Sequence, residues 1–432
     1  MGRDEAAHRT SDEVMTAPPA IEPRRIVIAG GGIAALEAVM ALHDLGQGRF
    51  DLTLVAPDDR FRLRPMTVAV AFSTGQVTDV PLRDVSSRFG VRLVRAAVEA
   101  VDADARRVRC SNGDEVGYDV LVLATGARAV TAYDDALTFS DRDLVALARL
   151  LDDVEQGLCS SVAVIVPPSG TWSLPAYELA LAIARHASDA GVADMPVHLV
   201  TPEPTPLAIF GTAGAEATRQ LLRDASIQLH TDSFASVERD GRITMMPGGR
   251  RITVARVVAL PRIEGLAIKG LPADDNGFVP TDDHGRVIGA EHVYAAGDGT
   301  NFPVKQGGLA TQQADAAARH IAADAGAAVD PVPFRPVMRG MLLTGAKPRF
   351  LRSEPAGGRG EPRVTDSALW WPPVKVFGRY LSQWLADEQG IAPSPDGEEH
   401  VAIDVELGPD REAAPLALQP LDPDSGQGGD GA

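Results

Sequence analysis

Runs of apolar and alternating residues divide this chain into segments of predicted strand and helix. Near the N-terminus, an apolar run covers Ile26 to Gly30, and a helical run of small and apolar residues begins near Ile33. A second strand is predicted over residues 50–57, where FDLTLVAP alternates in polarity. Together these segments form a βαβ unit of about thirty residues.

Three consecutive glycines lie between the first strand and the helix. Gly30 permits a tight turn, and Gly32 has no Cβ atom that would keep the backbone away from a phosphate. N–H groups at the helix start, with the positive end of the helix dipole, favour an anion. We therefore expect this turn to bind a dinucleotide pyrophosphate. The residues expected there are Gly30, Gly31, Gly32, Ile33, Ala34 and Ala35, with Ala35 in the place of a third glycine.

The end of the second strand lacks the acid that commonly binds ribose hydroxyls in dinucleotide folds. Ala56 stands in that place, and Asp58 and Asp59 follow two and three residues later. The ribose contact is therefore expected from Asp58, from Asp59, or from neither.

Residues 60–120 alternate as short strands with turns between them. Asn112 and Gly113 are a strong signal for a hairpin turn. The segment ends in a buried strand that runs into Ala-Thr-Gly. Thr125 and Gly126 either pass beneath a cofactor or form a plain β-turn.

A second βαβ-like region begins at Ser160. It contains a strand, a helix over residues 175–187 and a further strand over residues 196–203. The connection before the helix, PPSGTWSLP, offers only Gly170 for a close approach to a phosphate, and its three prolines have no N–H to donate. A nucleotide is therefore expected to bind here poorly, or in a different way.

The last third of the chain returns to the strand and helix pattern and then changes. VYAAGD is a strand that ends in a turn at Asp298, and an alanine-rich helix is predicted from Gln306 to about Ala325. Near the C-terminus, apolar residues recur at helical spacing, with Lys375 and Arg379 on the other side. This predicts an amphipathic helix within Trp370 to Leu385. It either lies in a membrane interface or packs on the domain that contains the glycine turn or on a second subunit of a homodimer. The apolar positions are Val374, Phe377, Leu381, Trp384 and Leu385.

Composition narrows the function further. The 432 residues carry a net charge of −18, which argues against a nucleic-acid partner. Cys110 and Cys159 are the only two cysteines, so neither a disulfide framework nor a cysteine-rich metal site is expected, and no cluster of metal ligands is visible. No run of eighteen apolar residues occurs, so no membrane span is expected. We predict a cytoplasmic protein, with peripheral contact at the inner face of the plasma membrane as the alternative.

The ordered set of three motifs, the glycine turn, the ATG strand end and the Gly297–Asp298 turn, resembles the two-dinucleotide-domain flavoproteins. The resemblance is closest to the sulfide:quinone oxidoreductase-like and type II NADH dehydrogenase-like branch. It implies an α/β fold with two Rossmann-like domains and a small C-terminal unit. The implied ranges are a disordered leader over 1–22, an FAD domain over 23–140 and 281–330, an NAD(P)-like domain over 141–280, a C-terminal unit over 331–388 and a disordered tail over 389–432.

The resemblance also implies roles for individual residues around a bound FAD. Gly30 and Gly32 match the turn under the pyrophosphate, Thr125 and Gly126 match the loop near the cofactor, and Gly297 with Asp298 matches the turn that holds the ribityl or pyrophosphate end. The segment Lys305, Gln306, Gly307 and Gly308 matches the loop that faces the flavin pyrimidine. Free N–H groups and an ammonium there favour the reduced, negatively charged flavin.

We therefore predict an FAD-dependent oxidoreductase that passes two electrons from a donor such as NAD(P)H to a quinone or another small acceptor. No acid or base is named, because the isoalloxazine carries the chemistry. One alternative is a sulfide or persulfide oxidoreductase without the usual cysteines, and another is a redox-silent flavoprotein that acts as a binding partner. Glu203 either accepts a hydrogen bond from a nucleotide ribose or is a surface acid, and Trp172 either stacks on a ligand ring or caps the core.

Overall fold

The computed structural model describes residues 22–140, 144–168, 170–192, 194–354 and 362–391. Its first sheet has five parallel strands in the order β20-β9-β1-β2-β5. The strands are β1 (Arg24–Ala29), β2 (Phe50–Ala56), β5 (Arg92–Arg95), β9 (Val120–Leu123) and β20 (Val293–Ala295). The predicted βαβ unit is confirmed, with α1 (Ile33–Gly46) between β1 and β2.

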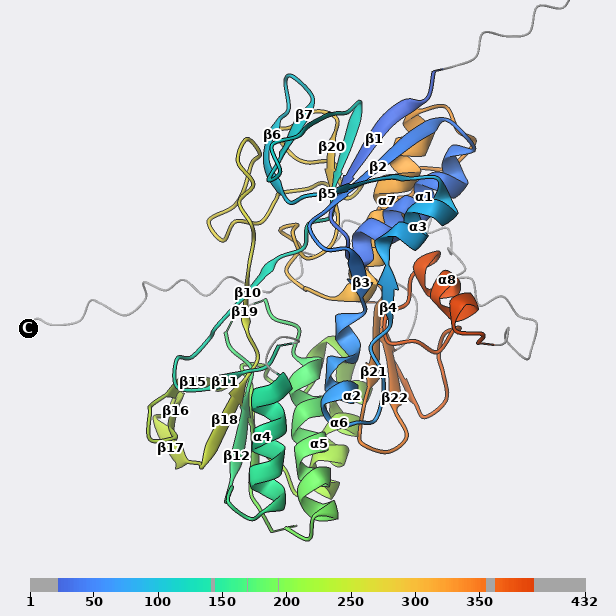
Figure 1. The fold of residues 1–432 in the computed structure, drawn as a ribbon. Coiled ribbons are helices and arrows are strands. Elements are labelled where there is room, and N and C mark those ends of the chain that lie inside the picture. The colour runs from blue at the N-terminus through green and yellow to red at the C-terminus, as the bar shows by residue number, and fades with distance from the viewer. Residues whose placement is uncertain (1–21, 141–143, 169, 193, 355–361, 392–432) are drawn as a thin grey trace, which may run out of the picture.

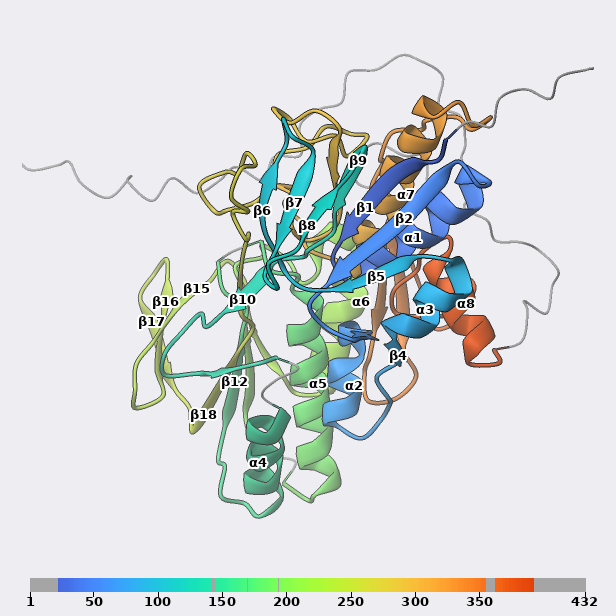
Figure 2. The ribbon, with the colours of Figure 1, turned by 45° about the horizontal axis from the view of Figure 1, so that its top comes forward.

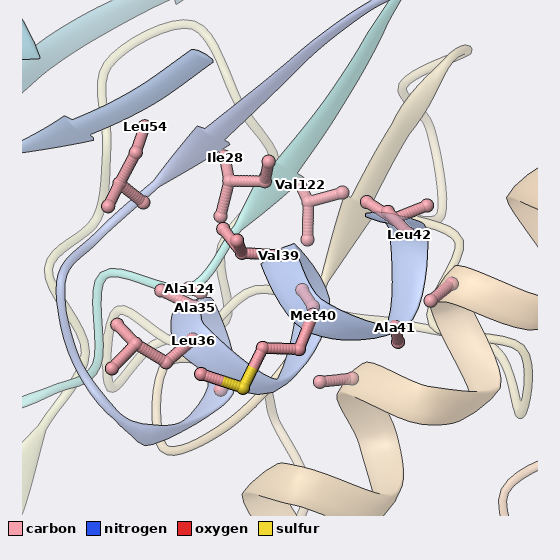
Figure 3. Close-up of a cluster of buried hydrophobic side chains, with 14 of the residues drawn as sticks. Ile28, Ala35, Leu36, Val39, Met40, Ala41, Leu42, Leu54, Val122 and Ala124 are labelled. Carbon is pink, nitrogen blue, oxygen red and sulfur yellow. The ribbon is translucent and has the colours of Figure 1, made fainter. Parts of the chain in front are cut away.

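Two helices lie side by side on one face of this sheet (Figure 1). They are α1 and α7 (Gly307–Asp324), and α3 (Leu82–Phe89) lies beside α1. Figure 3 shows Leu36, Val39 and Met40 of α1 in a cluster with the strand residues Ile28, Leu54 and Val122. Alanines occupy much of α1 and α7, and small side chains let the two helices approach closely.

An antiparallel sheet covers the opposite face of this parallel sheet (Figure 2). It consists of β6 (Val98–Asp102), β7 (Arg107–Cys110) and β8 (Glu115–Gly117). The hairpin predicted at Asn112 and Gly113 connects β7 to β8. Two short strands, β3 (Arg60–Arg62) and β4 (Asp79–Pro81), and the helix α2 (Thr67–Ala71) complete this part of the chain.

The second parallel sheet has the order β11-β18-β12-β13-β14. Its strands are β11 (Leu137–Thr138), β12 (Val162–Ile165), β13 (Val197–Val200), β14 (Gln228–His230) and β18 (Arg256–Ala259). The helices α4 (Leu144–Glu155), α5 (Leu174–Asp189) and α6 (Gly211–Asp224) accompany it, and its other face packs against β15 (Phe234–Val237), β16 (Arg242–Met246) and β17 (Arg250–Thr253). An antiparallel pair, β10 (Arg128–Val130) with β19 (Arg262–Glu264), connects the two sheet regions (Figure 1).

The C-terminal part is a small antiparallel sheet followed by a helix. The strands are β21 (Met338–Leu342), β22 (Arg349–Ser353) and β23 (Arg363–Thr365), and the helix is α8 (Leu381–Glu388). The predicted amphipathic helix is wrong before Leu381, because residues 370–380 have no helical structure.

Several large apolar residues of this segment are buried in the protein. Trp370 is 4% exposed and Trp384 is 9% exposed. These buried rings favour the alternative that the segment packs on the rest of the protein. Within the described ranges, no helix is long and apolar enough to cross a membrane. The predicted leader and tail lie almost entirely outside those ranges.

Candidate functional site

Three of the predicted turns meet at one edge of the first sheet. Since β1, β9 and β20 are parallel neighbours, their carboxyl ends lie together. Backbone hydrogen bonds fix this edge: Ala124 N donates to Ala29 O at 2.7 Å, and Ala296 N donates to Leu123 O at 2.9 Å. The glycine turn, the ATG turn and the Gly297–Asp298 turn are therefore adjacent, which is where parallel α/β sheets bind ligands.

Gly30 is required by the close approach of two of these turns. Its φ is +132°, and a Cβ atom at this position would lie 2.1 Å from the Ala124 carbonyl oxygen. Gly32 differs, because a Cβ atom there would meet no atom within 4 Å. Gly32 precedes α1 without a side-chain cap, so the first N–H groups of the helix are left for a ligand.

Asp298 lies in the turn after β20 and has no hydrogen-bond partner for its carboxylate among the residues that the structure describes. Burial raises the pKa of this carboxyl, and the nearby Lys305 ammonium opposes the rise. Gln313 of α7 fixes the turn, since its Oε1 accepts a hydrogen bond of 2.7 Å from Gly297 N. The backbone of the turn is thus held by Gln313, while the Asp298 oxygens are available to hydroxyl donors.

The Lys305–Gly308 loop leads into α7 and touches the start of α1. A Cβ atom at Gly307 would lie 2.9 Å from Ile33 Cδ1, so the N-termini of α1 and α7 are neighbours. Gln306 caps α7, because its Oε1 accepts a hydrogen bond of 3.0 Å from Leu309 N. The positive ends of two helix dipoles therefore face one region.

Lys305 is only 8% exposed and is held within its own loop. Its Nζ donates to the Thr300 carbonyl oxygen at 2.5 Å and lies 3.7 Å from the centre of the Phe278 ring. Burial lowers its pKa to about 8, against the opposing effects of Asp298 and Asp274. The ammonium thus stays largely charged at neutral pH and adds positive charge to this edge.

The remaining predicted site residues have different surroundings. Gly31 lies over Ala56, since a Cβ atom at Gly31 would be 3.1 Å from Ala56 Cβ, and Ala56 is fully buried. Asp58 and Asp59 are exposed beyond the end of β2. Thr125 and Gly126 lie beside Gly299, where a Cβ atom would be 2.9 Å from Gly126 O. Ala34 and Ala35 are buried in the first turn of α1.

These features fit an FAD bound in an extended form along the edge. The uncapped start of α1 suits a pyrophosphate, and Asp298 suits the ribityl hydroxyls. The start of α7, with Lys305, suits the flavin ring in its reduced, anionic form. Among the described residues, no group of His, Cys, Asp and Glu side chains could hold a metal ion.

The corresponding edge of the second sheet is already filled by a carboxylate. Glu203 accepts hydrogen bonds from the hydroxyls of Ser173 at 3.0 Å, Tyr177 at 2.6 Å and Thr201 at 3.0 Å. Ser173 precedes α5 and Tyr177 lies in its first turn, so this carboxylate occupies the position of an anion at the start of the helix. Burial raises the pKa of Glu203, and the three hydroxyls oppose the rise.

The loop before α5 also packs against the first domain. A Cβ atom at Gly170 would lie 2.7 Å from the Pro303 carbonyl oxygen. The Trp172 ring contacts Phe210 edge to face, with ring centres 5.9 Å apart. This contact favours the alternative that Trp172 covers the protein core over the alternative that it stacks on a ligand ring. Cys110 and Cys159 are both 1% exposed, and burial raises the pKa of each thiol, as expected of structural cysteines.

Buried charged groups lie near this region. Glu37 and Arg339 were not singled out from the sequence, and Lys375, expected on the polar side of the C-terminal helix, is buried against Glu178. Glu37 of α1 accepts hydrogen bonds from the backbone N–H groups of Tyr380 and Leu381, and Glu178 of α5 pairs with Lys375 at 2.5 Å. Arg339 of β21 is 7% exposed. A charged residue inside an apolar helical run was the available signal for Glu37 and Glu178, whereas nothing in the sequence near Arg339 indicated burial.

Comparisons with known proteins agree with this geometry. A family model described as pyridine nucleotide-disulphide oxidoreductase matches residues 24–320. An NADH dehydrogenase-like protein of Mycobacterium tuberculosis is 30% identical over 294 residues, which cover 63% of this chain and 72% of that protein. A sulfide-quinone reductase of Aquifex aeolicus is 26% identical over 221 residues, covering 50% of this chain and 51% of that protein.

Solved structures show the same fold. The crystal structure of the sulfide:quinone oxidoreductase from Aquifex aeolicus matches with a TM-score of 0.71 at 18% identity, and covers 79% of this chain and 87% of that one. The predicted fold class of two Rossmann-like domains is thereby confirmed.

Proposed function

This chain belongs to the pyridine nucleotide-disulphide oxidoreductase family, whose members are FAD-dependent oxidoreductases, and we propose that it passes two electrons through FAD to a quinone or another small acceptor. NAD(P)H is the first candidate donor, because the family uses pyridine nucleotides and the relative from Mycobacterium tuberculosis is named NADH dehydrogenase-like. Bound FAD would supply the hydride chemistry, and the chain would bind and orient it.

One observation carries this proposal, namely the meeting of the α1 and α7 N-termini beside Asp298. A Cβ atom at Gly307 would come within 2.9 Å of Ile33, so both helix starts serve one elongated site. In the proposed complex, the first N–H groups of α1 bind the pyrophosphate, and Asp298 binds the ribityl chain. The residues proposed to contact FAD are Gly30, Gly31, Gly32, Ile33, Ala34, Ala35, Thr125, Gly126, Gly297, Asp298, Lys305, Gln306, Gly307 and Gly308.

The adenosine end of FAD has fewer candidate contacts. Ala56 is buried where an acid is common, and Asp58 is exposed two residues later. We retain Asp58 as the proposed ribose contact, made from the surface of the site.

A second candidate is the oxidation of sulfide or a persulfide without a cysteine relay. The observation that favours it is Glu203, whose carboxylate takes three hydroxyl hydrogen bonds at the start of α5. A nucleotide pyrophosphate that binds at the start of this helix would have to displace the Glu203 carboxylate, or bind beside it despite the electrostatic repulsion between the two anions. Sulfide needs no site in the second domain.

Anaerobic titration of the purified flavoprotein separates the two candidates. Under the first proposal, NADH or NADPH bleaches the flavin absorbance, and an added quinone restores the colour. Bleaching by sulfide alone would replace the first candidate with the second. A flavin that no donor bleaches would refute both and favour a redox-silent binding protein. A chain that purifies colourless and does not take up FAD would refute the flavin assignment itself.

A further inference from the structure

The edge strand β5 begins and ends with an arginine, and the two side chains differ in their partners. Arg92 begins the strand, and its Nε donates a hydrogen bond of 3.3 Å to Thr53 Oγ1. Arg95 ends the strand and is exposed. Among the described residues, the Arg95 guanidinium makes no hydrogen bond and no ion pair within 4 Å. Arg95 is therefore the cation of this strand that is available to a ligand.

The register of the first sheet places Arg95 beside the carboxyl end of β2. Arg95 is the direct parallel neighbour of Ala56, and the N–H of the next residue, Ala96, donates to the Ala56 carbonyl oxygen at 3.0 Å. Ala56 stands where dinucleotide folds commonly have the acid that binds a ribose. In this chain, that position has a small apolar side chain, and a guanidinium lies on the adjacent strand.

Arg95 lies on the face of the sheet that bears α1 and α3. Side chains alternate between the two faces along a strand. Leu93 packs against the cluster that includes α1, whereas Val94 packs against the cluster on the β6–β8 side, so Arg95 shares the face of Leu93. The helix α3 packs beside β5 on this face (Figure 2). The glycine turn reaches the same corner, because a Cβ atom at Gly31 would lie 2.9 Å from Leu82 Cδ1 of α3.

The strand order assigns the adenosine half of FAD to this corner. The edge strands of the sheet are β20 and β5, and β1 is the central strand. Asp298 follows β20 and is proposed to hold the ribityl chain, and the start of α1 after β1 is proposed to hold the pyrophosphate. An extended FAD that passes these two points in this order continues over the ends of β2 and β5. Its adenosine then lies beside Ala56 and Arg95.

A guanidinium suits an adenine ring in this position. It is planar, charged at neutral pH and weakly hydrated, so it can lie flat against an aromatic ring. The nearest acids in the sequence, Asp58 and Asp59, follow the end of β2, and neither forms an ion pair with Arg95 within 4 Å. The guanidinium therefore does not have to leave a carboxylate in order to contact a ligand.

We propose that Arg95 binds the adenosine end of FAD by stacking its guanidinium on the adenine ring, and that this contact compensates for the acid that Ala56 replaces. Arg95 is then a specificity-determining residue, which favours the dinucleotide over flavins that lack adenosine. This inference rests on the proposed function, because it concerns the cofactor of the same site.

The test compares FAD with riboflavin 5′-diphosphate, which retains the flavin and the pyrophosphate but lacks adenosine. Binding of each flavin to the full-length protein, freed of its own flavin, is measured by calorimetry. In Arg95→Ala, the dissociation constant of FAD is expected to rise about fivefold or more, because the contact between the cation and the adenine ring is lost. The constant for riboflavin 5′-diphosphate is expected to stay within about twofold of the wild-type value.

Arg92→Ala is the matched control, since Arg92 is exposed on the same strand but lies on the opposite face, with Val94. This variant should bind both flavins as the wild type does. Equal weakening of both flavins in Arg95→Ala would show general attraction of the pyrophosphate, and this result, or no change in either constant, would overturn the adenine contact. FAD binding by the wild type would still support the proposed function in both of these cases. A wild type that binds neither flavin would refute the flavin assignment together with this inference.

Discussion

At the scale of single residues, the glycine turn shows that two neighbouring glycines serve different purposes. Gly30 is required by the protein itself, because its φ of +132° and the Ala124 carbonyl oxygen leave no room for a side chain. Gly32 has a φ of −96° and open space around a Cβ atom, so the folded chain does not need a glycine there. The requirement at Gly32 would come from the ligand.

This contrast predicts that substitution of one glycine affects the stability of the protein and substitution of the other affects flavin binding. Gly30→Ala should destabilise the protein without cofactor by roughly 2–4 kcal/mol, through backbone strain and the displacement of Ala124. Gly32→Val should leave that stability unchanged but abolish flavin retention, because its methyl groups would occupy the place of the pyrophosphate. Urea unfolding of the cofactor-free proteins and the absorbance of the purified proteins measure the two effects. A Gly32→Val variant that remains yellow would show that this turn does not anchor the flavin.

Lys305 shows what a motif can and cannot predict about one side chain. The sequence placed it in the loop before α7, and the structure has it there. Its Nζ, however, is held by the Thr300 carbonyl oxygen at 2.5 Å and lies over Phe278. These partners come from residues with no spacing rule relative to Lys305. The side-chain direction therefore could not be predicted from the sequence.

At the scale of elements, the sequence predicted best where local pattern and tertiary role agree. The glycines and the small apolar residues that follow favour both the turn and the buried helix α1, and the predicted start near Ile33 is confirmed. The segment 370–380 shows the opposite case. Its apolar residues recur at helical spacing, but Pro372, Pro373 and Gly378 oppose a helix and the apolar side chains are fixed by contacts with distant elements.

One of those distant contacts joins α1 to α8 through a buried carboxyl group. Glu37 is fully buried and accepts hydrogen bonds of 3.0 Å from Tyr380 N and 2.8 Å from Leu381 N. The carboxyl thus satisfies N–H groups at the start of α8. Burial raises its pKa from 4.5 to about 7, although the hydrogen bonds from Leu381 and Tyr380 oppose the rise.

The raised pKa of Glu37 predicts a specific pH dependence. Between pH 4.5 and about 7, the folded protein binds a proton at Glu37 that the unfolded chain releases, so the free energy of unfolding falls as the pH rises. The fall amounts to about 3 kcal/mol at most. Glu37→Gln should remove this part of the pH dependence in urea unfolding at pH 5 and pH 7.5. Asp44→Asn, at an exposed position on the same helix, should retain it. Parallel pH profiles for wild type and Glu37→Gln would refute the assignment.

At the scale of the whole molecule, the C-terminal unit joins the two sheet regions. Val376, Leu381 and Trp384 belong to the core of the first region, and Met338, Leu342 and Leu351 belong to that of the second. Gln306, in the loop proposed to face the flavin, bonds to β21 of the same unit. The sequence predicted two dinucleotide-type units and a smaller third one, but the third unit's contacts with both could not be deduced because they join residues far apart in the chain.

The contact between the C-terminal segment and the second region includes a buried ion pair. Lys375 Nζ lies 2.5 Å from Glu178 Oε2, and Leu343 N also donates to Glu178 at 2.9 Å. The Lys375 and Glu178 side chains are 6% and 0% exposed. Burial raises the pKa of Glu178, and Lys375 opposes the rise. Loss of the ammonium would leave a buried carboxylate with a single N–H donor.

Lys375→Met should therefore lower the free energy of unfolding by about 3–5 kcal/mol at pH 7.5, as is typical when one partner of a buried pair is removed. The loss should be smaller at pH 5, since the Glu178 carboxyl, with a pKa raised further in this variant, can then be protonated. Adding Glu178→Leu should recover most of the stability, because the unpaired charge is removed. Arg185→Met, which breaks an exposed pair on the same helix, should cost less than about 1 kcal/mol. Urea unfolding of the wild type and the three variants measures these differences, and a Lys375→Met variant as stable as Arg185→Met would show that the buried pair does not hold the C-terminal unit in place.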